Sequence, residues 1–252
     1  MVPWPVFIAA GALVGLLVGL FGVGGSSIAT PLLALLGVPG LLAIATPLPA
    51  TIPTAIAAAL SYSRNGETRP RAAGWTLLGS APAAIAGAFL SQTVGGARLL
   101  IASGLVLVVI GLRVIRPIAE PLQVSGTVRR RNRLLLVAAA AFVGFFSGLL
   151  ANGGGFLLVP MYLLAFGLDM RKAAGTSLLV IVVLSVPILA VHAALGHIDW
   201  TVAGAFSLGA VPTGFWSARL AQRVAARKLQ RTFGWFLVIS GLAFVVYRIV
   251  AA

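Results

Sequence analysis

The sequence contains no cysteine and only four acidic residues among 252. The absence of cysteine excludes disulfides, thiolate metal sites and cysteine nucleophiles. The carboxylates all fall in segments that we expect to be loops, namely Glu67, Glu120, Asp169 and Asp199. A proton relay or a cation site built from buried carboxylates is therefore not expected. No serine–histidine–acid arrangement or metal cluster is readable, so we expect no enzyme, no catalytic residue and no cofactor.

Apolar residues, in contrast, make up 60% of the chain, and the mean hydropathy is +1.08. A helix that crosses a hydrocarbon core needs about 20 apolar residues, and a soluble domain of this length could not bury so much apolar surface. We predict an all-α integral membrane protein of the cell inner membrane. Residues 1–11 lack the basic region of a cleavable signal peptide and are interpreted as part of the first membrane segment.

Basic residues are numerous, and the formal net charge is +14. Sixteen of the 18 lysines and arginines lie in four short segments, 64–71, 113–133, 171–172 and 219–231. This clustering is typical of cytoplasmic loops in a multi-pass membrane protein rather than of a nucleic-acid surface. A role in attracting cytoplasmic anions stays open as an alternative.

The chain contains two related halves. Residues 15–31 (GLLVGLFGVGGSSIATP) match 144–160 (GFFSGLLANGGGFLLVP) at a shift of 129, and later matches such as Thr46 with Thr176 follow at a shift of 130. The basic loop 64–71 corresponds to 194–201, which has no lysine or arginine. Corresponding loops are therefore expected on opposite sides of the membrane, which is the pattern of inverted-topology repeats.

We expect about eight to ten helical segments, five in each half, as judged by apolar length. The first half is predicted to contain 5–21, 26–37, 41–62, 73–92 and 98–115. The second is predicted to contain 134–151, 155–167, 171–194, 201–220 and 229–249. The short pieces, 26–37 and 155–167, would each close a broken-helix hairpin, so that three spanning helices remain per half. The predicted organisation is a first repeat 1–115, a cytoplasmic linker 116–132 and a second repeat 133–252, with both termini outside.

The glycine-rich helix breaks are the predicted site. Non-helical backbone at membrane depth is tolerated only where it faces protein or a watery cavity. With no lysine or arginine at mid-depth, an anion would be held by backbone N–H groups, hydroxyls, amides and helix N-termini. The hairpin tips are expected to meet near the membrane centre. The candidate substrate-binding residues are Gly22, Gly24, Gly25, Ser26, Ser27, Thr46, Asn152, Gly153, Gly154, Gly155, Thr176 and Ser177.

Several of these residues also have a purely structural interpretation. Gly15 with Gly19, and Gly144 with Gly148, form small-xxx-small pairs and are interpreted as close helix packing. Thr46 and Thr176 open long apolar helices and could simply cap them. The histidines, at positions 192 and 197, would lie about 140° apart on a helix, so they are not predicted to form a zinc pair. Proton coupling through His192 is kept as an alternative.

The two glycine motifs, each followed by an Ala-x-Gly-Thr-Ser type element, resemble the sulfite exporter TauE/SafE family of membrane permeases. The second half has the element in full, AAGTS at 173–177, whereas the first half has AIATP with Pro47 in place of serine. The resemblance covers nearly the whole chain. It implies export of sulfite, an organosulfonate or a related sulfur-containing anion.

The sequence thus predicts a secondary transporter of a small anion that is bound between the repeats near mid-membrane. Its expected partners are the substrate, the lipid bilayer and a coupling ion, proton or sodium, since no ATP-binding motif is present. Nucleic acid is not an expected partner. The alternatives are a transporter of another small solute and a non-transporting membrane scaffold.

Overall fold

The computed structural model describes residues 3–91, 96–116, 130–149 and 155–250. All regular structure in these residues is helical, which confirms the predicted all-α class for this part of the chain. The first half contains α1 (Trp4–Phe21), α2 (Ser26–Leu35), α3 (Gly40–Ala45), α4 (Leu48–Arg64), α5 (Pro70–Ser91) and α6 (Gly96–Ile115). The second half contains α7 (Arg130–Leu149), α8 (Gly155–Pro160), the π-helical turn η1 (Met161–Ala165), α9 (Met170–Ala194), α10 (Trp200–Arg223) and α11 (Ala226–Val250).

Prolines explain where the helices depart from the prediction. The expected helix 41–62 is divided into α3 and α4 at Thr46 and Pro47, because Pro47 has no N–H to continue the helical ladder. In the second half α8 ends at Pro160, and the chain continues as the π-helical turn η1. Helix α7 begins at Arg130, four residues earlier than predicted, so it includes part of the expected linker.

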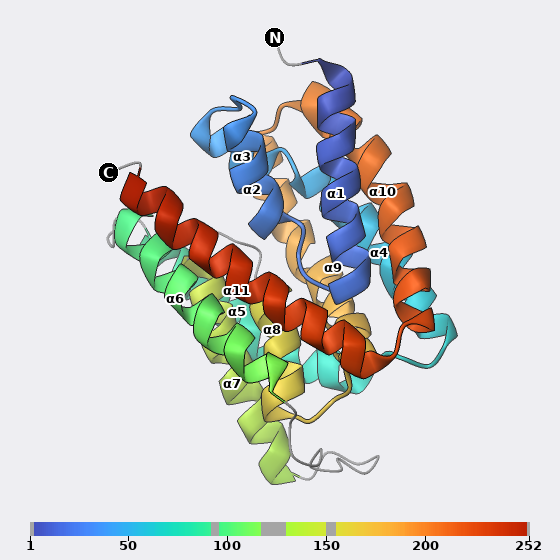
Figure 1. The fold of residues 1–252 in the computed structure, drawn as a ribbon. Coiled ribbons are helices and arrows are strands. Elements are labelled where there is room, and N and C mark those ends of the chain that lie inside the picture. Colours follow the sequence, from blue (N-terminus) through green and yellow to red (C-terminus); the bar gives the residue numbers. More distant parts are fainter. Residues whose placement is uncertain (1–2, 92–95, 117–129, 150–154, 251–252) are drawn as a thin grey trace.

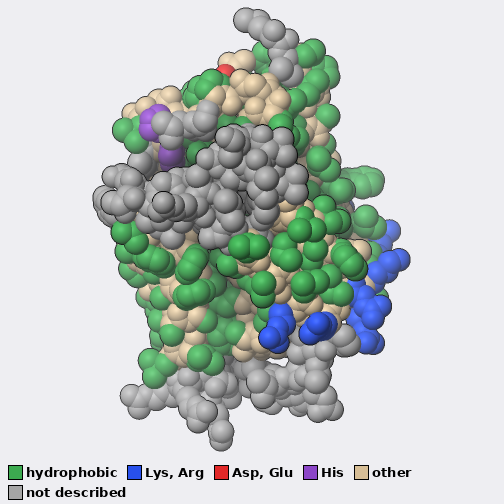
Figure 2. Space-filling view, turned by 60° about the vertical axis from the view of Figure 1, so that its left-hand side comes forward, with side chains coloured by type: hydrophobic (Ala, Val, Ile, Leu, Met, Phe, Trp, Pro, Cys, Tyr) green, Lys and Arg blue, Asp and Glu red, His purple; other side chains and the backbone are tan. Residues whose placement is uncertain are grey.

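Three helical segments in the described part of the chain are long and apolar enough to cross a membrane: Trp4–Phe21, Leu42–Arg64 and Met170–Ala194. Large apolar side chains also lie on the outer surface, where Leu208 is 69% exposed and Phe142 64%. Figure 2 shows a broad apolar surface, with lysines and arginines gathered towards one end of the molecule and the two histidines towards the other. Such a belt is what lipid-facing helices require.

The most extensive helix contacts join one half of the chain to the other, since α1 packs on α10, α5 on α7 and α6 on α11. Under the repeat match α1 corresponds to α7 and α10 to α5, so the first two contacts are the same contact made twice. Figure 1 shows that α1 and α7 run in opposite directions. Helices α4 and α9 pack against each other between these pairs.

Glycines allow these close approaches. A Cβ on Gly15 would lie 2.2 Å from the carbonyl oxygen of Ala210, and one on Gly144 would lie 2.3 Å from that of Ser80. Gly19 is equally crowded, with Ser217 Oγ at 2.0 Å from its would-be Cβ. The interpretation of these three residues as close-packing glycines is confirmed. Gly148, the fourth of these glycines, lies on α7, and its close packing stays a prediction.

Candidate functional site

The first glycine segment leaves α1 through a left-handed turn that only glycine fits. Gly22 has φ +68° and donates its N–H to the carbonyl oxygen of Val18 at 2.8 Å. A Cβ at this position would lie 2.5 Å from the Cα of Ala174 on α9. The backbone of the tip is therefore in direct contact with α9, at the AAGTS element of the second half.

Ser177 fastens this contact. Its hydroxyl donates to the carbonyl oxygen of Gly22 at 2.6 Å and shares the proton with Ala174 O at 2.9 Å. Ser177 is fully buried. Of the predicted site residues, the structure thus brings together Gly22 and Ser177, which come from opposite halves and are 155 residues apart in the chain.

Helix α2 starts inside the bundle. Gly25 is its N-cap residue and Ser26 its first residue, and residues 21–25 are all buried. The first amides of a helix have no partner within the helix and carry partial positive charge. Figure 1 shows α2 beside α1 with its first turn within the molecule and its last turn towards one end. This start can receive a negatively charged group without any basic side chain.

The position of the first tip can be measured along α9, through the contact of Ser177 with Gly22. Ser177 lies seven residues after the start of α9, which corresponds to about 10 Å of helical rise. The whole of α9 rises about 37 Å over its 25 residues. Ser177 therefore lies about 8 Å from the middle of α9, slightly closer to the middle than to the arginine-bearing start of that helix, and a meeting of the two tips near the membrane centre stays a prediction.

Tyr62 is a second anchor of the first tip, and the sequence interpretation missed it. Its hydroxyl lies 3.0 Å from the carbonyl oxygen of Gly19 and 3.2 Å from that of Leu20, at the end of α1. The last carbonyls of a helix receive no N–H from within the helix, so the tyrosine hydroxyl supplies the missing donor. A buried tyrosine needs a partner for its hydroxyl, and an isolated tyrosine in the alanine-rich 55–62 segment was the available signal.

Thr46 and Thr176 each contact the other half of the chain. The Thr176 hydroxyl accepts from the backbone N–H of Arg69 at 3.1 Å, and the Thr46 hydroxyl accepts from that of Asp199 at 3.1 Å. Both pairs obey the shift of 130. Each buried threonine therefore secures the residue just before a helix of the other half, α5 or α10, rather than capping the helix it was expected to open.

Only Gly155 of the second glycine tip falls within the described residues. Asn152, Gly153 and Gly154 lie outside the described residues, as do the side chains of Ser26 and Ser27. Gly155 is the first residue of α8. Gly24 lies within the buried first tip. Whether the two tips share one cavity stays a prediction.

The two repeats use the same turn at opposite ends of the molecule. Gly66 and Gly196 both have φ +69°. The turn at Gly66 returns Glu67 N–H to the carbonyl of Tyr62 at 3.0 Å, and the turn at Gly196 returns His197 N–H to that of His192 at 3.0 Å. A left-handed residue after a helix produces this reversal.

The turn at Gly196 corrects the expected separation of the histidines. The estimate of about 140° assumed that one helix carries both rings, but α9 ends at Ala194. Because the chain folds back, the Nδ1 atoms of His192 and His197 lie 3.3 Å apart. No group of three or more histidine, cysteine or acidic residues that could hold a metal occurs among the described residues.

At the other end of the molecule, polar contacts tie α9 to the loop after α4 and to α10. Arg171 Nη1 lies 3.9 Å from Glu67 Oε1, and Arg171 Nη2 donates to the carbonyl oxygen of Val224 at 2.7 Å. Gln222 donates to the Ser61 hydroxyl at 3.0 Å and also pairs with Asn65. This end therefore carries several direct links between the two halves.

A helical bundle with a broken hairpin buried in its interior and an apolar outer surface defines a multi-pass membrane protein. The family model for the sulfite exporter TauE/SafE family matches residues 7–244. The chain belongs to this family, and it is therefore a membrane transporter for a small solute and not an enzyme.

The similar proteins are transporters by description. A "Probable membrane transporter protein" of Xylella fastidiosa (strain 9a5c) is 34% identical over 252 residues, covering 96% of this chain and 95% of the relative. The "Probable membrane transporter protein YjnA" of Bacillus subtilis (strain 168) is 26% identical over 250 residues, covering 93% and 97%. No solved structure matches the chain.

Proposed function

We propose that the chain is a secondary transporter that exports a small sulfur-containing anion, such as sulfite or an organosulfonate, from a site between its two repeats. The observation that carries this proposal is the buried start of α2, which offers helix-terminal N–H groups beside Gly22 and Ser177. Such groups bind anions without a compensating basic residue. Membership of the sulfite exporter TauE/SafE family supports the substrate class.

The proposed orientation places the arginine-bearing end in the cytoplasm and both termini outside. Its support is the confinement of 16 of the 18 basic residues to four segments, together with the positive-inside rule. The opposite directions of α1 and α7 support the inverted relation of the repeats (Figure 1). The second tip, with Asn152, Gly153, Gly154 and Gly155, would contribute to the site by this pseudo-twofold relation.

The proposed moving units are not the two halves of the sequence. Helices α1, α4 and α10 contact one another, and of the corresponding helices α5 contacts both α7 and α9. The first tip, together with α9, joins one group to the other. Alternating access would therefore proceed by movement of one mixed group against the other, with the Ser177–Gly22 contact between the groups changing and the contacts of Thr46 and Thr176 kept within each group.

The test uses purified protein and a serine variant at the tip. Binding of sulfite, sulfate, thiosulfate and a short organosulfonate is measured by calorimetry, and transport of the bound anion is followed in proteoliposomes. Ser177→Ala should weaken binding about tenfold, since it frees the Gly22 carbonyl and removes a nearby donor. The matched control is Ser217→Ala, because Ser217 is also buried and donates to a glycine carbonyl, that of Gly15 at 3.3 Å. Equal effects of the two variants, or no binding of any sulfur anion, would contradict the proposal.

A further inference from the structure

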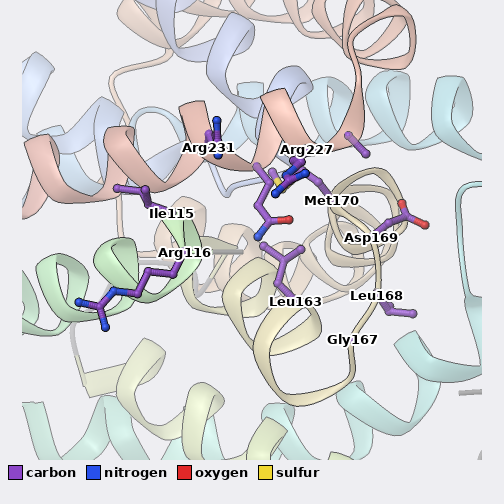
Figure 3. A pocket seen from close by; sticks show the side chains of 11 residues that line it. Ile115, Arg116, Leu163, Gly167, Leu168, Asp169, Met170, Arg227 and Arg231 are labelled. Carbon is purple, nitrogen blue, oxygen red and sulfur yellow. The ribbon is translucent and has the colours of Figure 1, made fainter. Parts of the chain in front are cut away.

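A cavity lies away from the glycine tip, at the arginine-bearing end of the molecule. Its volume is about 400 Å³, and it is bounded by the end of α6, the start of α11 and the loop between η1 and α9. Figure 3 shows the side chains that line it. The cavity belongs to a different set of elements from the α1–α2 tip, so it is a separate feature.

The cavity carries an excess of positive charge. Arg116, Arg227 and Arg231 line it, and within the described part of the chain none of them has an ion-pair partner. The carboxylate in the lining, Asp169, already forms an ion pair with Lys172, whose Nζ lies 2.5 Å from its Oδ2. Arginine stays protonated under all ordinary conditions, and a concave surface concentrates the field of such charges.

The floor of the same cavity is apolar. Leu163 and Met170 line it and are almost completely buried, and Ile115 adds a further apolar side chain to the lining. A site for a small hydrated ion would not need such a floor. An apolar floor below a cationic rim fits a molecule that has an oxyanion at one end and a hydrocarbon part at the other.

We propose that this cavity binds an amphiphilic oxyanion, with a phosphate or sulfonate group held by the arginines and an apolar chain against Leu163 and Met170. Two sources share this chemistry, namely the headgroup of an anionic lipid and a free organosulfonate with a hydrocarbon chain. Basic pockets between membrane helices on the cytoplasmic side commonly hold lipid headgroups. The second source rests on the proposed transport function, whereas the first is independent of it.

The arginines differ in their present orientation. Arg227 lies between α11 and the loop before α9, whereas the guanidinium of Arg116 extends away from the cavity (Figure 3). All three arginine side chains are exposed and have no described ion pair to break. A bound oxyanion would recruit Arg116 at the cost of side-chain entropy only. Arg227 and Arg231, one turn apart on α11, are therefore the first variants to test.

The first arm of the experiment tests the lipid. Full-length protein is incubated in detergent with phosphatidylglycerol or phosphatidylethanolamine, and bound lipid is counted by native mass spectrometry. The wild type should retain phosphatidylglycerol preferentially. Arg227→Gln with Arg231→Gln should weaken that retention tenfold or more, and Arg227→Lys with Arg231→Lys should restore part of it, because the charge remains. The control is Arg219→Gln, which removes one positive charge from α10 outside the cavity lining, where Arg219 lies 4.2 Å from the Phe215 ring centroid.

The second arm tests the free anion. Octanesulfonate is titrated into the same variants in phosphatidylcholine nanodiscs, where no anionic lipid competes. Loss of sulfonate binding in the double glutamine variant, with phosphatidylglycerol retention unchanged, assigns the cavity to a free anion. The reverse pattern assigns it to lipid. If neither probe distinguishes the double variant from Arg219→Gln, the cavity is not an oxyanion site. Because Ser177→Ala reports on the tip alone, failure here leaves the transport test intact.

Discussion

The arginine-bearing and histidine-bearing ends of the molecule have the same backbone turns but differ in the side-chain hydrogen bonds that stabilise them. At both ends a glycine at φ +69° reverses the chain, and a buried threonine accepts a backbone N–H from the other half. At the arginine-bearing end, Tyr62 and Ser177 also bind carbonyls of the first glycine tip. At the histidine-bearing end, the position of Ser177 is occupied by Pro47, which has no hydroxyl.

This difference shows that sequence symmetry does not require equal stability at the two ends. Tyr62 corresponds to His192 and Glu67 to His197 at the shift of 130. The arginine-bearing end thus has a tyrosine bonded to the end of α1 and an ion pair between Glu67 and Arg171. The other end has two imidazoles in contact with each other. Under the proposed inverted-repeat mechanism the two ends would open in different states, and we expect the unequal polar contacts to favour one of these states.

The largest expected effect on stability is at Gly22, where the first glycine tip contacts α9. Gly22→Ala combines a left-handed backbone with a Cβ 2.5 Å from Ala174, and should lower the free energy of unfolding by about 3 kcal/mol. Gly196→Ala has the same backbone strain but open space around its Cβ, and should cost about 1 kcal/mol. Unfolding in mixed detergent micelles measures both, and equal losses would contradict the close contact of the tip with α9.

The tyrosine gives the next effect. Tyr62→Phe keeps the ring but leaves the carbonyls of Gly19 and Leu20 without a donor, which should cost about 1–3 kcal/mol. His192→Phe at the corresponding position of the other repeat should cost less, because its side chain is only partly buried. A larger loss for the histidine variant would reverse the order of the two ends.

The threonines sharpen the comparison because their contacts are the same at both ends. Thr46→Val and Thr176→Val each remove one buried acceptor from a backbone N–H at 3.1 Å. Each should lower the free energy of unfolding by about 1 kcal/mol, and the two losses should agree. A clear difference between them would show that the ends already differ at the shared contact, and not only at the groups around it.

These comparisons also show how far the sequence carries the prediction. Helix existence, the repeats and the packing role of Gly15, Gly19 and Gly144 follow from apolar runs and spacing. The break at Pro47 could be expected from proline chemistry. The contacts of Thr46 and Thr176 could not, since they depend on which helix of the other half lies opposite. The contact between His192 and His197 depends on the turn at Gly196, and helix periodicity does not predict that turn.

The smallest effect concerns the two imidazoles. The Nδ1 atoms of the two rings lie 3.3 Å apart, so acid that protonates both rings would bring two positive charges together and destabilise the folded protein. The stability contributed by this end should therefore fall as the pH falls through the range where histidine titrates. His197→Gln should flatten the dependence of the melting temperature on pH between about 7 and 5, whereas Glu67→Gln at the corresponding position should not. An unchanged pH profile in His197→Gln would mean that the histidine contact does not set the stability of that end.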